Sequence, residues 1–401
     1  MYLTNEQEAI LRGEEGWAKK KCLEIIVALG EIYGADRLIP VASTQISGVS
    51  YKTLGEYGLQ WVESLAPAKV VVPSTLNPAG MDLGGWSEMG VPEDFAAKQM
   101  RVIRAYAKLG VTTLCSCTPY LAGFAPRFRE HVAWSESSAV CFVNSYLGAR
   151  TNREGGPSAL ASAITGLTAN YGLHLDENRR PTAIVKVSAK LAGLSDYSAL
   201  GYRLGKLLQQ HIPYLRGLPT LGVDEAKALS AAAAASGNLA LFHAEGFTPE
   251  SEVSVGEVRE RLHIDDKDLK GVYEELSTIR SGNIDLVAIG CPHSSLTELK
   301  AAAALLKGKK VSPATKLWFF TSLPVKVLAE RLGFVDVIEG AGGKVFTDCC
   351  MIVAPLEQMG FTTMAVNSAK AALYAPTASK VEVVFTTFEK CIDIALEGRL
   401  R

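Results

Sequence analysis

The sequence predicts an α/β protein whose β-strands run mostly parallel. Short runs of apolar and β-branched residues alternate with amphipathic helical patterns, and polar or glycine-rich loops follow several of these runs. The chain has 401 residues, which is too long for one ordinary domain, so we expect two or three domains that share an interface. A hydrophobic content of 48% with 21% charged residues is typical of a well-packed globular protein.

The first part of the chain begins with a capping-box spacing, Thr4 to Gln7, which opens a helical pattern that runs towards Tyr33. The apolar runs 38–42, 69–73 and 111–115 are predicted strands, and a helix is predicted at 92–109. Each of these strands is followed by a loop rich in polar residues, with the sequences STQISGVSY, STLNPAGMDLGGW and SCTPY.

The remainder of the chain divides into two further parts. A polar loop and a helix are predicted at 134–153, strands at 182–187, 239–242, 284–289, 317–320 and 345–348, and helices at 296–306 and 324–332. We therefore expect three α/β regions, at 1–155, 156–280 and 281–401. Because open α/β sheets bind ligands beyond the carboxyl ends of their strands, the loops after the strands are expected to share one active site.

Charge and the chain start exclude several classes of protein. Lysine and arginine number 41 and aspartate and glutamate 42, so the net charge is −1, which leaves no general basic field for nucleic acid. Acidic residues occupy the stretch where a signal peptide needs an apolar core, and the alanine-rich stretches at 230–236 and 301–306 are too short to span a bilayer. We expect a cytoplasmic protein with reduced cysteines and no membrane partner.

Three of the eight cysteines follow predicted strands, namely Cys117, Cys291 and Cys350. If they converge, their thiolates suit a metal or an iron–sulfur cluster. Three protein ligands to a four-iron cluster leave one iron open, and an open position is what a Lewis-acid catalyst needs. The alternative is that these are small buried apolar residues, as most free cysteines are.

The other cysteines are weaker candidates. Cys115 competes with Cys117 because side chains alternate along a strand, which puts both on the same side. By the same alternation, at most one of Cys349 and Cys350 enters a site. The cysteines of predicted helices are expected to be structural: Cys22, Cys141 and Cys391.

Polar groups that could bind an anion also occur in these loops. His293, Ser294 and Ser295 open a helix, where free backbone N–H groups favour an anion, and ordinary capping by serine is the alternative. The other candidates, for which plain turns and solvated faces are the alternatives, are Asn77, Asp82, the turn Gly48, Val49 and Ser50, the polar run Glu136, Ser137, Asn144, Arg150, Asn152 and Arg153, and Lys370. The remaining histidines are expected to pack or to lie on the surface: His131, His174, His211, His243 and His263.

Several familiar motifs are missing from the sequence. It has no G-x-G-x-x-G fingerprint after a strand, no Walker A loop and no H-E-x-x-H pair. The absence of G-x-S-x-G argues against an α/β-hydrolase.

The motifs that are present resemble those of the aconitase X family over essentially the whole chain. The most specific stretches are CTPY and AWSESSAVCFVNSYLGARTNREGG, supported by ISGVSY, NPAGMD, GCPHSS, FTDCC and NSAK. The resemblance implies an aconitase-like fold of three α/β domains around a central iron–sulfur site, with a swivelling fourth domain on a separate small subunit. It places the iron ligands at Cys117, Cys291 and Cys350. The family's Asp-Thr-Cys is here Asp348-Cys349-Cys350, which leaves Cys350 as the matching ligand.

The resemblance also implies the chemistry. It implies a hydro-lyase with a [4Fe-4S] cluster, which air can degrade to [2Fe-2S] or a single iron, and a proton-abstracting base on the small subunit. The implied reaction is dehydration of (R)-5-phosphomevalonate to trans-anhydromevalonate 5-phosphate in the archaeal mevalonate route to isoprenoids. Dehydration of cis-3-hydroxy-L-proline is the alternative, and a non-catalytic iron–sulfur regulatory or RNA-binding protein ranks lower. The implied substrate-binding residues are Gly48, Val49, Ser50, Asn77, Pro78, Glu136, Ser137 and Lys370.

Overall fold

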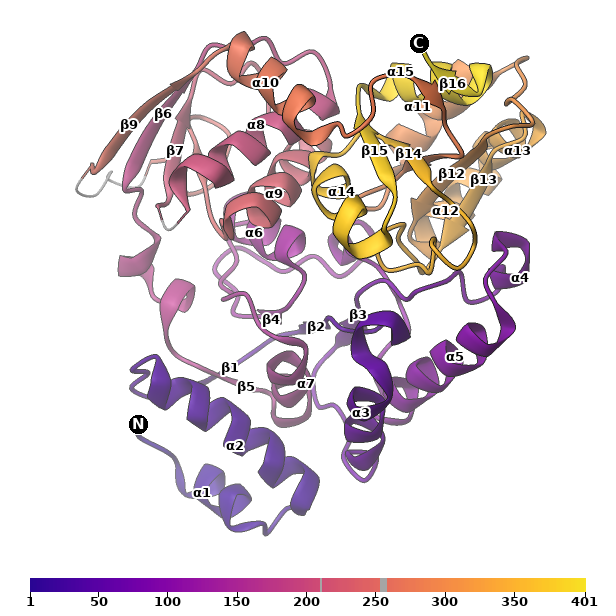
Figure 1. The fold of residues 1–401 in the computed structure, drawn as a ribbon. Helices are drawn as coiled ribbons and strands as arrows, with labels where there is room; N and C mark the ends of the chain where they lie inside the picture. The colour runs from indigo at the N-terminus through magenta and orange to yellow at the C-terminus, as the bar shows by residue number, and fades with distance from the viewer. Residues whose placement is uncertain (210, 253–257) are drawn as a thin grey trace.

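The computed structural model describes residues 1–209, 211–252 and 258–401, which form three regions around a common centre (Figure 1). We call them the first region (1–180), the second region (181–280) and the third region (281–401). One hydrophobic core includes Trp134 of the first region, Leu229 of the second and Phe320 of the third, so the three regions are packed against one another. Their meeting place is also where the polar loops come together.

The first region is built on a small parallel sheet. Its central strand β2 (Thr44–Ile46) pairs in parallel with β3 (Ser74–Leu76) and β4 (Ala133–Trp134). A separate antiparallel pair joins β1 (Leu38–Pro40) to β5 (Leu167–Ala169). The helices are α1 (Asn5–Arg12), α2 (Trp17–Ile32), α3 (Tyr51–Ser64), α4 (Trp86–Met89), α5 (Glu93–Lys108), α6 (Ser137–Ser145) and α7 (Gly156–Thr165), with short 3₁₀ turns at Pro119–Leu121, Gly172–His174 and Asp176–Arg179. Helix α7 packs against α2 and β2, so residues 156–169, which the expected division places in the second lobe, lie with the first region.

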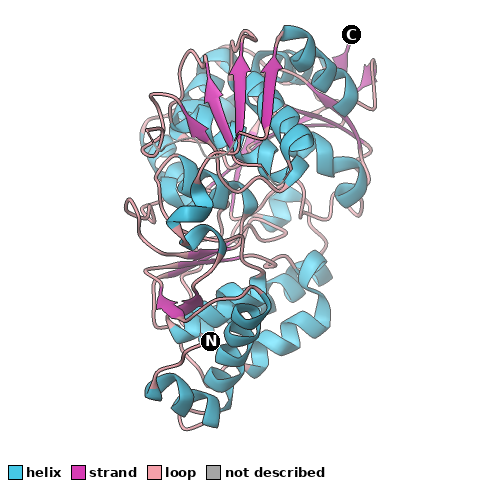
Figure 2. Cartoon of the chain, turned by 90° about the vertical axis from the view of Figure 1, so that its left-hand side faces the viewer, coloured by secondary structure: helices cyan, strands magenta, loops and turns pink. Residues whose placement is uncertain are grey.

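The second region carries a four-stranded parallel sheet in the order β8-β7-β6-β9. Figure 2 shows strands of this sheet as arrows that run side by side in one direction. Helices α8 and α9 pack tightly against each other, and α9 also packs against α6 of the first region. The elements are β6 (Ala183–Val187), α8 (Leu194–Leu208), β7 (Pro213–Arg216), α9 (Val223–Gly237), β8 (His243–Ala244), β9 (Glu260–Ile264) and α10 (Asp266–Leu276).

The third region carries a five-stranded parallel sheet in the order β13-β12-β11-β14-β15, with a small antiparallel pair, β10 and β16. Buried apolar residues line both faces of the sheet, as expected where helices cover a parallel sheet on both sides. The elements are β10 (Gly282–Asn283), β11 (Leu286–Ile289), α11 (Leu296–Leu306), β12 (Lys316–Thr321), α12 (Leu323–Arg331), α13 (Phe334–Gly340), β13 (Lys344–Thr347), β14 (Thr363–Val366), α14 (Ala369–Tyr374), a π-helical turn (Ala375–Ser379), β15 (Glu382–Phe385), α15 (Phe388–Glu397) and β16 (Arg399–Leu400).

The predicted fold class, an α/β protein with mostly parallel sheets, is confirmed. The predicted helix at 296–306 is confirmed to the residue, and the strands at 182–187, 284–289, 317–320 and 345–348 are confirmed with shifts of one or two residues at their ends. The helices at 92–109 and 324–332 are confirmed with similar shifts.

Several predicted elements of the first two regions are wrong. The single helix to Tyr33 is two helices, because Gly13 and Gly16 adopt positive φ angles between them. The β-branched run 69–73 is not a strand: Val70 and Val71 donate to carbonyls at the ends of helices, those of Leu109 and Ala163, and the strand β3 begins after them. The run 111–115 forms only an isolated bridge between Cys115 and Leu76, and the strand expected at 239–242 is β8, at 243–244.

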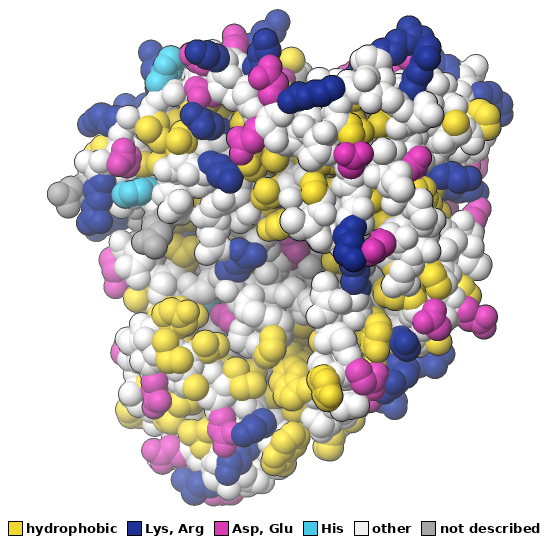
Figure 3. All heavy atoms as spheres, viewed as in Figure 1, with side chains coloured by type: hydrophobic (Ala, Val, Ile, Leu, Met, Phe, Trp, Pro, Cys, Tyr) yellow, Lys and Arg dark blue, Asp and Glu magenta, His cyan; other side chains and the backbone are white. Residues whose placement is uncertain are grey.

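The surface agrees with the near-neutral charge of the chain. Figure 3 shows Lys and Arg side chains interspersed with Asp and Glu on the face viewed, and hydrophobic side chains gathered over the first region. Within the described part of the chain, no helix is long and apolar enough to cross a membrane.

Candidate active site

Cys117, Cys291 and Cys350 line one cavity of about 240 Å³ at the junction of the first and third regions. Cys291 and Cys350 follow the carboxyl ends of the parallel strands β11 and β13, and Cys117 follows the bridge that Cys115 makes with β3. The other five cysteines are buried and free, and they do not line this cavity: Cys22, Cys115, Cys141, Cys349 and Cys391.

The approach to Cys291 depends on a glycine. Gly290 has a φ of +113°, and a Cβ atom at this position would lie 2.2 Å from the carbonyl oxygen of Phe320 in β12. No larger residue fits between these two backbones, so the chain turns sharply at the end of β11 and directs Cys291 into the cavity.

A buried ion pair faces the three cysteines. Lys370, in the first turn of α14, contacts the carboxylate of Glu136, the N-cap residue of α6, and the side chains are 12% and 11% exposed. Asn77 donates to Glu136 Oε2 at 2.7 Å, and Ser138 Oγ donates at 2.9 Å to Oε1, the oxygen that Lys370 contacts. Burial alone would raise the pKa of Glu136, but the Lys370 charge and these hydrogen bonds outweigh it and lower that pKa to about 2.

Gln45 connects the loops of Glu136, Asn77 and Cys117 through hydrogen bonds. Its Oε1 accepts from the backbone N–H of Glu136 at 2.8 Å, and its Nε2 donates to Asn77 Oδ1 at 3.3 Å and to the carbonyl of Ser116 at 3.2 Å. Gln45 is completely buried in β2, so the loop that carries Cys117 and the loop that carries Glu136 are fixed relative to each other.

The sulfur atoms have distinct electrostatic surroundings. Burial, and then the negative charges of Glu136 and Cys350, raise the pKa of Cys117 to about 12, and Lys370 and the His293 N–H oppose this rise. A hydrogen bond from Cys291 lowers the pKa of Cys350, and the same bond together with burial raises that of Cys291. The N–H of His293 lies 3.2 Å from Cys117 Sγ, and that of Ile352 lies 3.4 Å from Cys350 Sγ.

This donor set fits a cluster better than a single ion. Among the described residues, no group of three or more His, Cys, Asp or Glu is arranged to hold one metal ion. In an iron–sulfur cluster, by contrast, each cysteine binds a different iron atom, so the sulfurs need not converge on one point. Three thiols on one cavity, with backbone N–H groups directed at two of them, match the ligand chemistry of such a cluster.

Most of the predicted substrate-binding residues lie at this cavity. Asn77, Pro78, Glu136, Ser137 and Lys370 line it, and so does Arg153 of the predicted polar run. The turn Gly48, Val49 and Ser50 adjoins it, because Ser50 Oγ donates at 3.0 Å to the carbonyl of Val353, a lining residue.

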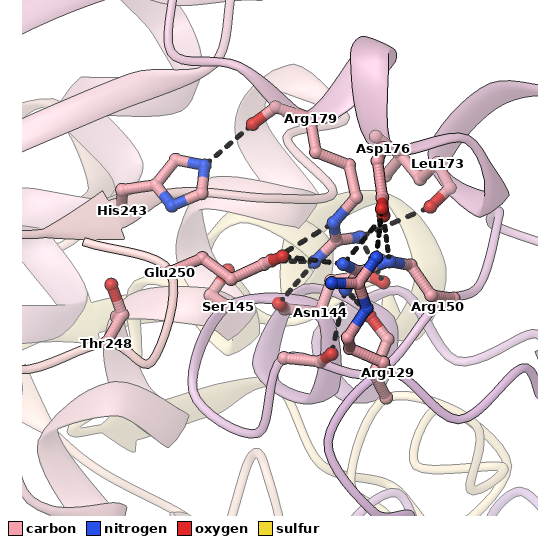
Figure 4. A network of polar contacts seen from close by, with 12 residues as sticks. Arg129, Asn144, Ser145, Arg150, Leu173, Asp176, Arg179, His243, Thr248 and Glu250 are labelled. Atoms are coloured by element: carbon pink, nitrogen blue, oxygen red, sulfur yellow. Dashed lines mark hydrogen bonds and ion pairs between the residues drawn. The ribbon is translucent and has the colours of Figure 1, made fainter. Parts of the chain in front are cut away.

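Six other residues that the sequence singled out as candidates for binding an anion do not line the cavity, namely Asp82, Asn144, Arg150, His293, Ser294 and Ser295. Asp82 accepts from the N–H of Thr347 at 2.7 Å and so joins the first region to the third. Ser295 caps α11, Ser294 is buried beside it, and His293 is buried behind the cysteines. Asn144 and Arg150 belong to a separate network, shown in Figure 4, in which Arg150 pairs with Asp176 and Glu250, and Arg179 also pairs with Glu250.

Other lining residues were not anticipated from the sequence. Tyr374 lies four residues after Lys370 on α14, so helical spacing would have put both on one face. Ser135 directly precedes the predicted polar run at Glu136, whereas Ser47 is the first residue of the SGVS turn that the sequence singled out. Ile352 and Val353 follow Cys350 and carried no chemical signal.

Comparisons with known proteins find aconitase X relatives along nearly the whole chain. Sequence profiles described as aconitase X first, second and third domain match residues 1–177, 181–274 and 284–397. The phosphomevalonate dehydratase large subunit of Methanocaldococcus jannaschii is 50% identical, and the alignment covers 98% of this chain and 99% of that protein. The cis-3-hydroxy-L-proline dehydratase of Pseudomonas aeruginosa is 35% identical over 98% of this chain and 69% of that protein. The crystal structure of Thermococcus kodakaraensis aconitase X in its holo-form superposes with a TM-score of 0.92 at 46% identity, covering 98% of this chain and 100% of the other. The chain belongs to the aconitase X family.

Proposed function

We propose that this chain is the large subunit of a phosphomevalonate dehydratase, which removes water from (R)-5-phosphomevalonate to give trans-anhydromevalonate 5-phosphate. The observation that carries the proposal is that cysteines from three separate segments meet the buried Lys370–Glu136 pair at one cavity. The 50% identity to the M. jannaschii large subunit, against 35% to the hydroxyproline enzyme, favours the phosphorylated substrate.

We assign Cys117, Cys291 and Cys350 as the residues that would hold a [4Fe-4S] cluster. When bound, such a cluster supplies a Lewis-acidic iron that makes hydroxide a better leaving group. The backbone N–H groups at Cys117 and Cys350 favour the thiolate form that a ligand must adopt.

The cations of the cavity are suited to an anionic substrate. Burial lowers the pKa of Lys370, but the negative charge of Glu136 outweighs it and raises that pKa, so this ammonium stays positive at neutral pH. Arg153 lies at the exposed edge of the same cavity. We assign these two side chains, with Asn77 and the turn at Gly48, Val49 and Ser50, to the substrate's carboxylate and phosphate groups.

The base that removes the substrate's α-proton is expected on a second chain. An effective general base has a pKa near the working pH. Glu136 is held far below that range by its partners, and Lys370 is held protonated by the same pair. The M. jannaschii relative is named as a large subunit, so we propose that a small swivelling-domain subunit supplies this base.

The proposal is tested by anaerobic reconstitution with iron and sulfide, followed by incubation with (R)-5-phosphomevalonate with and without the small subunit. We expect the dehydrated product only when both iron and the partner are present. Turnover of cis-3-hydroxy-L-proline in place of phosphomevalonate would overturn the substrate assignment, and turnover after removal of iron would overturn the cofactor assignment.

A further inference from the structure

His293 is completely buried on the Cys291 loop and bonds to the two loops that carry the other proposed iron ligands. Its backbone N–H donates to Cys117 Sγ at 3.2 Å. Its ring Nδ1 lies 3.1 Å from the hydroxyl of Ser116, the residue before Cys117. Its ring Nε2 lies 2.8 Å from the carbonyl oxygen of Cys349. Because a carbonyl oxygen only accepts, Nε2 carries a proton and donates to it.

Each of these bonds acts on the backbone next to a proposed ligand. The Cys349 carbonyl belongs to the peptide group that leads into Cys350, so the bond from Nε2 restrains the position of Cys350. Ser116 in turn accepts from the N–H of Thr118 at 3.0 Å, which closes the turn around Cys117. His293 itself lies two residues after Cys291, so one side chain connects the three loops.

The loop of His293 is in turn fixed by the second region. Lys227 of α9 donates to the His293 carbonyl oxygen at 3.1 Å. On the other side, the next residue, Ser294, donates its N–H to the carbonyl of Phe320 at 2.8 Å. The backbone that carries His293 is therefore held by the second and third regions, and its imidazole connects the other two loops from this fixed position.

We propose that His293 is a positioning residue that holds the Cys117, Cys291 and Cys350 loops in register, so that the three sulfurs are placed for an iron–sulfur cluster before it binds. The inference rests on the cofactor assigned under the proposed function. Partners of this kind, one contact behind the ligands, typically contribute 10- to 100-fold to metal affinity. His293 has no contact with the cavity and is assigned no direct part in the reaction.

The test is the rate at which a chelator removes iron from anaerobically reconstituted protein, with iron per chain and apoprotein melting temperature measured in parallel. His293→Ala removes both ring bonds, and we expect iron release to accelerate by about 10- to 100-fold. His293→Gln can retain the donor to Cys349, and His293→Asn can retain the contact to Ser116. Both are expected to give intermediate rates.

Two matched controls separate positioning from general stability. His243 is another buried histidine whose Nε2 bonds to a carbonyl, that of Arg179, at 2.8 Å, but it lies away from the cysteines. His243→Ala should lower the melting temperature and leave iron release unchanged. Ser294→Ala, directly beside His293, removes a buried hydroxyl that has no hydrogen-bond partner among the described residues. This variant should also leave the rate of iron release unchanged.

Unchanged iron release in His293→Ala would overturn the proposal, as would an equal acceleration in His243→Ala. If His293→Ala does not fold, His293→Gln and His293→Asn decide the matter, because each is expected to lose only one of the two ring bonds. None of these measurements uses the substrate. A wild-type chain that binds iron but does not dehydrate phosphomevalonate would therefore refute the proposed function and leave this inference standing.

Discussion

The buried ammonium of Lys227 is the point at which loss of one charge should be most damaging to the fold. Its side chain is 2% exposed and pairs with Glu298, which is 9% exposed, and with Asp224 at 3.3 Å. Lys227→Met keeps the apolar stem and leaves the Glu298 carboxylate buried without a counter-ion. Breaking a buried pair in this way costs about 3–5 kcal/mol, which is a large part of the roughly 5–15 kcal/mol by which proteins are stable.

The assay is urea unfolding of the anaerobic apoprotein, with the free energy of unfolding compared among variants. Lys227→Met/Glu298→Gln removes both charges and should recover most of the loss, because replacing a whole buried pair is far less harmful than breaking it. Lys344→Met is the matched control: Lys344 pairs with Glu88 on the surface, where the side chains are 37% and 57% exposed, and its loss should cost at most about 1 kcal/mol. The reasoning is refuted if Lys227→Met costs no more than this control, or if the double variant is as unstable as the single one.

Three further predictions follow from the site and its surroundings. Serine at Cys117, Cys291 or Cys350 should sharply reduce iron per chain after reconstitution, whereas Cys22→Ser, Cys391→Ser and Cys349→Ala should retain it; full retention in the first three variants would disprove the ligand assignment. Gly290→Ala should lower both the melting temperature and the iron content, because its Cβ would meet the Phe320 carbonyl at 2.2 Å, and an unchanged protein would show that the turn can relax. Burial, together with His131, Arg179 and Arg150, lowers the pKa of His174 from 6.5 to about 3, so the unfolded chain takes up a proton there more readily than the folded one, and stability falls as the pH drops below 6.5 towards 3. Between pH 6.5 and 5.5, the free energy of unfolding measured by urea titration should therefore fall by about 1 kcal/mol less in His174→Phe than in the wild type. Parallel plots of unfolding free energy against pH for the two proteins would contradict this.

The elements of the third region from β11 to β13 were predictable because the sequence signals for them are local and strong. Its strands are buried on both faces, so they appear in the sequence as uninterrupted apolar runs, as in the segment of β12 that contains Trp318, Phe319 and Phe320. The helices between them carry clear start signals, such as Ser295 and Glu298 at the two ends of a capping box.

The sheet of the first region was not predictable for the opposite reason. Its strands are two or three residues long and contain buried polar side chains, such as Gln45 in β2 and Thr75 in β3. Gln45 hydrogen-bonds the site loops, so its strand is polar where a propensity rule expects apolar residues. The β-branched run at 70–72 lies near the surface instead, with Val71 58% exposed.

Around the candidate site, too, some features were identifiable from the sequence and others were not. The loops were identifiable because glycine, proline and cysteine cluster after apolar runs. Lys227 was not identifiable: it lies in an alanine-rich helix, and its partners His293 and Glu298 are 66 and 71 residues away in the sequence. Contacts across such separations arise only when the regions pack together, and no local pattern records them.

The paired cysteines at the end of β13 show how a correct expectation can have an incomplete reason. Alternation along a strand predicts that Cys349 and Cys350 point to opposite sides, and they do: Cys349 Sγ packs 3.9 Å from Met89 Sδ, while Cys350 lines the cavity. The strand, however, ends at Thr347, and Asp348 has a left-handed φ of +63°. What fixes the direction of Cys350 is the backbone that leads into it, because Ala79 donates to the Asp348 carbonyl at 2.7 Å and His293 donates to that of Cys349. The choice between the two thiols is therefore made by contacts from two other segments of the chain, and a change that loosens those contacts should affect iron binding even though it leaves both cysteines in place.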